Sequence, residues 1–413
     1  MFGRLGSLWS TARGRALVVV PILLVAIWLS FRITAATVFA RSNPALALAI
    51  DSSNSWAAER QATLISGEAT PEAARRAAAL AKRALRESPL SAEAAATLGT
   101  AETILRPDTP PLAAFQYSQM LTRRLALTQI WFIEYGVSQA NIPIALQAYD
   151  RLFRTADVYR KQFLPTLLQA SAESEVTRGM TKVLATRPPW TGDYFGGLLA
   201  TFPGPVNFVR LVEAMRFDVQ NPDEAGRLAL AIGRLIDSGR PDLALHLYAR
   251  ATHVRTASIP LLREGAFERL GRLPPIDWEL ADNEQLRAEL GTNEAGQPAL
   301  NLVNRGGRVG AFARQLLFLV PGRYRLQYAT GGVTGDVADR PKVLLTCFAA
   351  GTPLSATSVP TAPSRGRNVM INFSVPAQGC SSQWLVLEAG NPIDTVAGDQ
   401  WIGNINLVRV NHD

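Results

Sequence analysis

Cysteine and histidine are scarce in this chain of 413 residues, which has two of the first and three of the second. Two cysteines cannot build a disulfide-dense scaffold or a four-thiolate zinc site. His246 and His253 are seven residues apart and would share one helix face, but no third ligand accompanies them, so we interpret both as structural. The sequence therefore predicts no metal site and no cofactor.

Catalytic signatures are also missing, since the GxSxG, HExxH, P-loop and EF-hand patterns do not occur. Asp277 and Glu279 would lie about 7 Å apart in a strand, a spacing found in inverting glycosidases, but such pairs of acids are commonplace. Asp336 and Asp339 lie in a glycine-rich loop and could bind calcium, but we interpret them as solvated turn residues. We predict a protein without enzymatic activity and keep an unrecognised glycan-processing enzyme as an alternative.

Charge is sparse and weakly patterned. Charged residues make up 18% of the chain and hydrophobic ones 47%, with a net charge of +8. Half of that excess comes from Arg4, Arg13, Arg15 and Arg32, because residues 1–40 contain no acid. The remainder is dispersed without a basic run, which argues against nucleic acid as a partner. The length and apolar content predict two or three folded domains.

Residues 16–31 form a stretch of sixteen uncharged, mostly apolar residues, and the apolar character resumes after Arg32. A bilayer core of about 30 Å needs roughly 20 helical residues, so residues 16–38 suffice if Arg32 snorkels to the far interface. The preceding arginines predict a cytoplasmic tail over residues 1–15 and an exported body. The alternative is a cleaved signal peptide, with Val38 and Ala40 before the cut. The length of the segment favours a single-pass anchor.

Export gives the two cysteines a role. Cys347 and Cys380 lie in the same C-terminal region, and an oxidising compartment would allow them to form a disulfide. Closing a loop of about 33 residues would stabilise the fold by roughly 3–4 kcal/mol in the chain-entropy model. The alternative is a pair of buried free thiols.

Residues 41–273 are rich in alanine and leucine, and proline punctuates them. Apolar residues recur at spacings of three and four between Pro71 and Pro89, and a second helix is expected from Ala92. Further helices are expected over residues 206–217, 222–238, 241–254 and 259–270. We predict an α-solenoid whose concave surface binds a protein partner, with a plain helical bundle as the alternative.

These helices resemble tetratricopeptide repeats, which are helix–turn–helix units of 34 residues. The resemblance rests on residues that fall where the family places small and apolar packing residues. They are Ala77, Ala84, Leu85, Leu98, Gly99, the Trp131-Phe-Ile-Glu134 stretch, Ala145, Tyr149 and Leu152.

A change of composition follows Pro274 and Pro275, and residues 276–413 read as short strands separated by glycine, proline and asparagine. The expected strands cover residues 315–320, 323–329, 342–349, 368–375, 383–389 and 402–410. They predict a jelly-roll-like β-sandwich, so the whole chain is expected to be an α+β multidomain protein.

Such sandwiches often resemble carbohydrate-binding modules, which stack sugars on aromatic side chains. Tyr328 shares a face with Tyr324 and is expected in the core rather than in a binding platform. The parity of Trp384 places it on an outer face, and Trp401 follows a glycine-containing turn. Trp384 and Trp401 are therefore the candidate glycan contacts.

The order of anchor, helices and cysteine-bearing sandwich resembles a group of bacterial envelope proteins associated with exopolysaccharide production. The resemblance rests on residues 141–154, the Arg187-Pro-Pro-Trp190 corner, Asp277-Trp278, Pro321-Gly-Arg-Tyr324 and Gly379-Cys380 with Gln383-Trp384-Leu385. It implies a scaffold held in the bacterial inner membrane, with a periplasmic body that binds protein partners of an envelope or polysaccharide assembly. The alternative is a polysaccharide-binding protein that acts through its β-sandwich.

Overall fold

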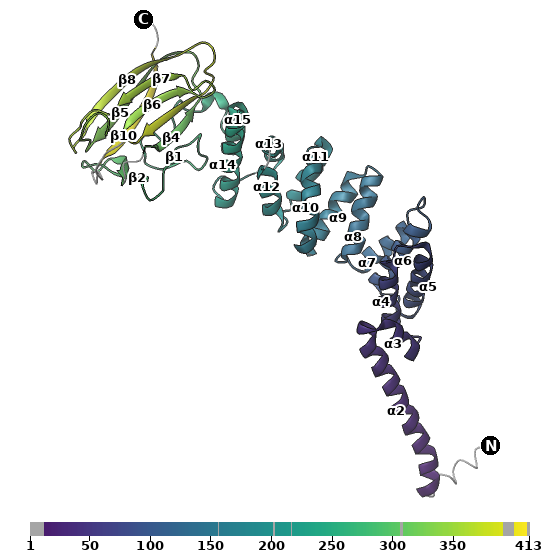
Figure 1. Ribbon diagram of the computed structural model, residues 1–413. Coiled ribbons are helices and arrows are strands. Elements are labelled where there is room, and N and C mark those ends of the chain that lie inside the picture. Colours follow the sequence, from purple (N-terminus) through teal and green to yellow (C-terminus); the bar gives the residue numbers. More distant parts are fainter. Residues whose placement is uncertain are drawn as a thin grey trace. The chain divides into compact units, whose positions relative to one another are not determined.

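The computed structural model describes residues 12–155, 157–200, 203–215, 217–305, 309–390 and 400–410. The chain divides into two compact units. Unit 1 consists of residues 1–164 with 186–190, and unit 2 of residues 165–185 with 191–413. Helices make up the N-terminal part and two antiparallel sheets the C-terminal part, which confirms an α+β protein with a β-sandwich (Figure 1).

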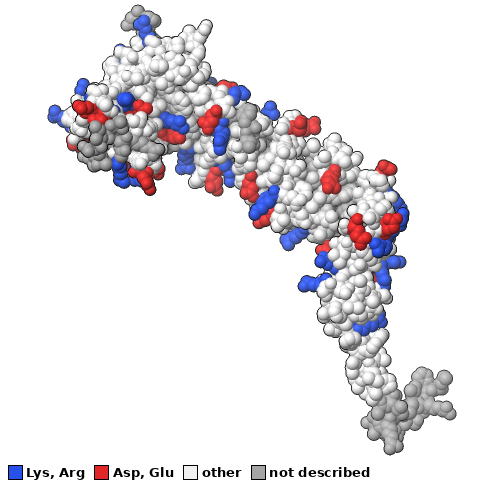
Figure 2. All heavy atoms as spheres, in the orientation of Figure 1, with Lys and Arg blue, Asp and Glu red and all other residues white. Residues whose placement is uncertain are grey.

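The first helix is long and apolar. Its segment Val19–Ser42 has a mean hydropathy of 2.1 and is long enough to cross a membrane, although a signal sequence has the same properties. In Figure 2 the described part of this helix is white up to the first blue side chains, so the visible face of its apolar stretch carries no charge. The predicted cytoplasmic tail falls largely on residues 1–11, which lie outside the described residues, as do the side chains of residues 12–18.

Short alanine-rich helices follow in unit 1. Thr70 accepts a hydrogen bond from the amide of Ala73 at the start of the helix that begins with Pro71, and Ser91 caps the next helix in the same way. Alanine side chains fill the contacts between these helices, which lets the backbones approach closely. The helices of this part are α2 (Ala12–Ser42), α3 (Pro44–Ile50), α4 (Ser55–Ser66), α5 (Pro71–Glu87), α6 (Ala92–Leu105), α7 (Leu112–Leu121), α8 (Ala126–Ser138), α9 (Ile142–Thr155) and α10 (Asp157–Ala170), the last of which crosses into unit 2.

Unit 2 continues with five more helices. They are α11 (Ser174–Leu184), α12 (Thr191–Ala200), α13 (Gly204–Ala214), α14 (Pro222–Asp237) and α15 (Pro241–Thr252). The sequence predicts α5, α6, α14 and α15 to within two residues at each boundary that it specifies. It also predicts a helix over residues 259–270, and this prediction is wrong.

The segment 259–270 contains turns and bends instead of a helix. Glu264 and Phe267 have φ angles of 47° and 55°, which a right-handed helix cannot accommodate. The backbone of Gly265 accepts a hydrogen bond from the amide of Ile405, and the buried Arg263 side chain donates to the carbonyls of Ile276 and Leu316. Contacts with the sandwich therefore override the local helical pattern.

The sandwich consists of two five-stranded antiparallel sheets. The first sheet has the order β1-β4-β9-β6-β7 and the second β2-β3-β10-β5-β8. The strands are β1 (Glu279–Leu280), β2 (Leu286–Thr292), β3 (Pro298–Asn304), β4 (Ala311–Leu317), β5 (Gly322–Gly331), β6 (Lys342–Cys347), β7 (Pro353–Ser358), β8 (Arg367–Val375), β9 (Gln383–Glu388) and β10 (Trp401–Val410). All six predicted strands overlap strands of the structure, and β1, β2, β3 and β7 are additional.

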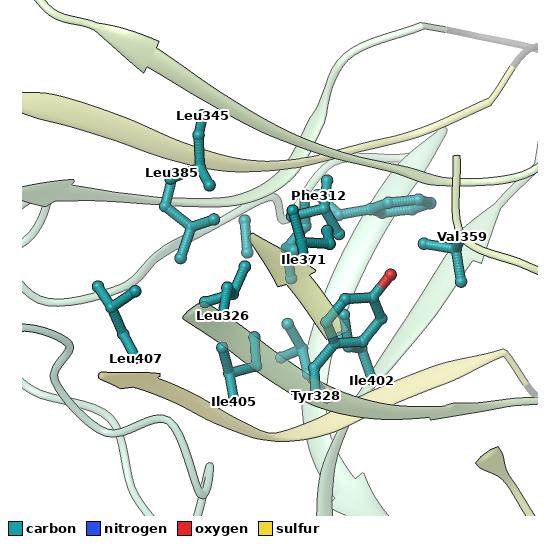
Figure 3. Close-up of a cluster of buried hydrophobic side chains, with 14 of the residues drawn as sticks. Phe312, Leu326, Tyr328, Leu345, Val359, Ile371, Leu385, Ile402, Ile405 and Leu407 are labelled. Carbon is teal, nitrogen blue, oxygen red and sulfur yellow. The ribbon is translucent and has the colours of Figure 1, made fainter. Parts of the chain in front are cut away.

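The core of the sandwich lies between the two sheets. Leu345 and Leu385 of the first sheet face Leu326 and Ile371 of the second (Figure 3). Tyr324 and Tyr328 are 1% and 2% exposed, which confirms their expected place in the core.

The predicted disulfide is present. Cys347 at the end of β6 is bonded to Cys380 ahead of β9. Both residues belong to the buried core of the sandwich, so the bond ties two neighbouring strands of the first sheet at one end.

Candidate functional site

A pocket of 380 Å³ with several polar side chains in its lining opens on the second sheet of the sandwich. Its lining comes from β2, β3, the turn between them, the segment ahead of β8 and the start of β10. The lining residues are Glu289, Thr292, Asn293, Glu294, Asn301, Leu302, Val303, Ser364, Gln400 and Trp401. Ligand pockets in proteins are concave in this way and carry a few convergent polar groups.

The register of the sheet brings three of these residues into one row. Glu289 on β2 is paired with Asn301 on β3, and Asn301 is paired with Trp401 on β10. Directly opposed residues of antiparallel strands point to the same face. Leu300 and Leu302 point to the core from the same strand as Asn301, so the row lies on the outer face of the sheet.

The turn between β2 and β3 shapes one end of the pocket. The side chain of Asn293 accepts hydrogen bonds from the amides of Ala295 and Gln297, at 3.0 and 2.9 Å. Gly296 has a φ angle of 73°, which suits glycine at this position of the turn. These contacts fix the loop that presents Thr292 and Glu294 to the pocket.

Trp401 forms a wall of the pocket rather than an open platform, because only 5% of its surface is exposed. Its indole Nε1 donates to the carbonyl of Ser364 at 3.0 Å. The ring packs against Gly331 and Gly366, where a Cβ atom would collide with it; at Gly366 the separation would be 2.6 Å. Trp401, a predicted glycan contact, therefore lines the pocket but offers it little aromatic surface.

Several polar side chains of the pocket have unused hydrogen-bonding capacity. Within the described part of the chain, the side chains of Glu289, Thr292, Glu294, Asn301 and Gln400 have no hydrogen bond or ion pair. The two amides supply both donors and acceptors, whereas the carboxylates only accept. Among the described residues that line the pocket there are two glutamates and no lysine or arginine, so this part of the lining carries negative charge.

Trp384, the second predicted glycan contact, lies elsewhere. It stands on β9 in the first sheet, and the guanidinium of Arg314 lies 4.9 Å from the centre of its ring. Phe348 packs at 6.2 Å, and Trp384 lines a cavity of 320 Å³ together with residues of α14. The two tryptophans therefore belong to different sheets, and the structure does not bring them together.

Asp277 and Glu279 face different partners. Asp277 is 5% exposed and accepts hydrogen bonds from the Tyr248 hydroxyl and the Leu273 amide, both at 2.9 Å. Glu279 pairs with Arg314 at 2.7 Å on the surface. This geometry assigns Asp277 to a contact between α15 and the sandwich, and Glu279 to a surface ion pair.

Burial dominates the electrostatics around Asp277. Burial of the Tyr248 hydroxyl raises its pKa, and the negative charge of the neighbouring Asp277 raises this pKa further. Burial also lowers the pKa of Arg263 to about 10, against the opposing influence of Tyr248 and Asp277. Charged side chains of the adjoining 500 Å³ cavity also have partners within the protein, since Arg269 forms an ion pair with Glu264 and Arg272 donates hydrogen bonds to backbone carbonyls.

Neither histidine discussed above belongs to a cluster of ligands. His246 lies 2.8 Å from a carboxylate oxygen of Glu213, and His253 ends α15 in a left-handed conformation. Across the described ranges of the chain, no group of three or more histidine, cysteine, aspartate or glutamate side chains could hold a metal ion.

Sequence reasoning did not identify the polar residues of the pocket, including Glu289, Asn301 and Gln400. A signal for the hairpin was present, because Leu300 and Leu302 alternate with Asn301 and Val303 after the Asn-Glu-Ala-Gly turn. The row across three strands, by contrast, depends on a pairing register that joins residues about a hundred positions apart.

No family model matches the chain, and no curated protein matches it. Several solved structures are similar to its C-terminal β region. The carbohydrate-binding module CBM4 is 14% identical, with 36% of this chain and 99% of that chain covered and a TM-score of 0.27. TmCBM61, solved with β-1,4-galactotriose, is 21% identical, with 37% and 100% covered and a TM-score of 0.27. A family 16 carbohydrate-binding module is 19% identical, with 36% and 99% covered and a TM-score of 0.27.

Proposed function

We propose that the protein binds a carbohydrate in the pocket around Asn301 and that its N-terminal helix holds it at a membrane. The observation that carries this proposal is a set of polar side chains on one concave surface that have no hydrogen bond or ion pair within the described part of the chain. Amide groups can donate to and accept from the paired hydroxyls of a sugar ring at the same time. The buried Trp401 closes one side of the pocket beside these groups.

The charge of the pocket narrows the class of sugar. Glu289 and Glu294 would repel the carboxylate of a uronic acid, because like charges at close range are unfavourable. They would accept hydrogen bonds from hydroxyl groups and attract an amine. The preferred ligands are therefore neutral or amine-bearing glycans.

Calorimetric titration of the full chain tests this proposal. Neutral β-linked oligosaccharides, chitosan oligosaccharides and oligouronates serve as three probes. Asn301→Ala is expected to weaken binding of the preferred probe at least tenfold, which corresponds to about 1.4 kcal/mol. Asn406→Ala is the matched control, because Asn406 is exposed on β10 in the same sheet and does not line the pocket. Unchanged binding in the Asn301 variant would contradict the proposal.

A second candidate function is binding of a protein partner by the helices, and an exposed apolar patch in unit 1 favours it. Leu90 and Met120 are 80% and 82% exposed, and Tyr117 joins them, with its hydroxyl donating to the carbonyl of Pro89 at 2.8 Å. A photo-cross-linking residue at Met120 should capture one defined partner, and one at the exposed Arg75 should not. The role in exopolysaccharide production stays a prediction.

A further inference from the structure

The first helix is longer than a bilayer core is thick. α2 contains 31 residues, so it extends over about 46 Å at the ordinary helical rise, against about 30 Å of hydrocarbon. A substantial part of α2 must therefore lie outside the hydrocarbon. The question is where the boundary falls and what surrounds the apolar residues beyond it.

Arg32 marks that boundary. Its Nη2 donates to Asp51 at 2.9 Å and its Nε donates to the carbonyl of Ile50 at 2.9 Å. Its guanidinium also lies 5.5 Å from the centre of the Trp28 ring. Hydrogen bonds from Ser53 and the charge of Arg32 lower the pKa of Asp51, so this carboxylate is ionised in the pair. An ion pair beside a tryptophan is characteristic of the polar edge of a membrane and not of its centre.

The same contacts show that α3 turns back along α2. The end of α3 reaches Arg32, although α3 begins only after α2 has ended at Ser42. Ala40, Ala47 and Ala57 form the buried contact between α2, α3 and α4. Residues of α3 therefore lie beside the last ten residues of α2, within about 15 Å of the level of Arg32 along the helix axis.

Large apolar side chains surround this region. We call them the collar, which consists of Ile33, Val38 and Phe39 on α2, Leu46 on α3 and Trp56 on α4, all of them exposed. Cationic side chains accompany them. The Arg41 guanidinium lies 5.4 Å from the centre of the Trp56 ring, and the exposed Arg60 follows one turn later on α4.

We propose that the collar lies in the headgroup layer of the membrane on the side of the folded body. The collar is continuous with the apolar span, and its tryptophan suits the interface. The neighbouring Arg41 and Arg60 complement lipid phosphates. The hydrocarbon segment then covers residues 16–31, about 24 Å of helix, in place of the predicted 16–38. This span is shorter than the usual hydrocarbon core of about 30 Å, and the bilayer accommodates it by thinning locally around the helix. Arg32 reaches the interface through its bond to Asp51, and unit 1 rests against the bilayer instead of standing away from it.

The two native cysteines make a direct test possible, because both are buried in a disulfide. Single cysteines are introduced as Leu46→Cys and Trp56→Cys in the full chain and labelled with the environment-sensitive dye NBD. Leu24→Cys serves as the control within the span, and Met120→Cys as the control in water, since both positions are well exposed in the protein. The labelled proteins are reconstituted in phosphatidylcholine–phosphatidylglycerol vesicles with spin-labelled quenchers in the headgroup, the upper acyl chain or the lower acyl chain.

The proposal predicts that the dye at residues 46 and 56 is blue-shifted relative to residue 120, and that headgroup and upper-chain quenchers reduce its emission at least twofold. The dye at residue 24 should respond to the lower-chain quencher. Water-like emission at residues 46 and 56, with residue 24 inserted, would overturn the proposal. So would lower-chain quenching at residue 46, because the span would then extend past Arg32. An unquenched residue 24 would overturn the anchor as well. None of these outcomes bears on the sugar pocket.

Discussion

Replacement of Asp277 by alanine should strongly destabilise unit 2. The substitution removes a charged acceptor that holds the Tyr248 hydroxyl and the Leu273 amide, both at 2.9 Å. Each buried donor left without a partner costs about 1–3 kcal/mol. The loss also removes a favourable influence on the buried cation of Arg263. The expected total is about 3–5 kcal/mol, within the range seen when one member of a buried polar pair is deleted.

Scanning calorimetry of the full chain measures this effect. At about 2–4 °C per kcal/mol for a unit of this size, the transition of unit 2 should fall by roughly 10 °C. Glu279→Ala is the control, because the Glu279–Arg314 pair is more than 40% exposed on both sides and is worth about 0–1 kcal/mol. A shift below 2 °C for Asp277→Ala would refute the structural role. A glycan-hydrolysing activity of the wild type that is lost in Asp277→Ala and also in Glu279→Ala would refute it as well.

Three further perturbations test other parts of the fold. Replacing both Cys347 and Cys380 by alanine should lower the free energy of unfolding of the sandwich by about 4 kcal/mol, because the disulfide closes a loop of 33 residues. A loss below 1 kcal/mol in urea unfolding would contradict this prediction. Burial raises the pKa of Glu59, so the ionised form of this residue weakens the fold as the pH rises above the unfolded value of about 4.3. Glu59→Gln should therefore raise the melting temperature at pH 7 but not at pH 3.5. Equal gains at both pH values would contradict this. Gly366→Ala should displace Trp401 and weaken sugar binding, whereas Gly351→Ala, which also has a positive φ but no atom within 4 Å of the added Cβ, should leave binding unchanged in the same titration.

Much of the helical part is predictable because the residues that begin its helices act locally in the sequence. Pro71, Pro222 and Pro241 each stand at the first position of a helix, and side-chain caps precede two of them. The failed helix over residues 259–270 shows the limit of such reasoning. Its apolar spacing is helical, but the buried contacts of Arg263 with Ile276 and Leu316 decide its conformation.

Six of the ten strands of the sandwich and its disulfide were predictable, whereas β1, β2, β3 and β7 and the site were not. Alternation along β5 placed Tyr324 and Tyr328 in the core, and alternation along β9 placed Trp384 on an outer face. The pocket depends on the pairing of Glu289, Asn301 and Trp401 across three strands. A periodicity along one strand carries no information about its register with a strand a hundred residues away.

The most direct test of the carbohydrate pocket is the titration of the wild type and Asn301→Ala, side by side, with the oligosaccharide that the wild type binds best. The proposed pocket predicts saturable binding of a neutral or amine-bearing glycan by the wild type, a loss of at least tenfold in Asn301→Ala, and wild-type affinity in Asn406→Ala. No binding to any of the three probe classes, or equal affinity in the wild type and Asn301→Ala, would contradict it.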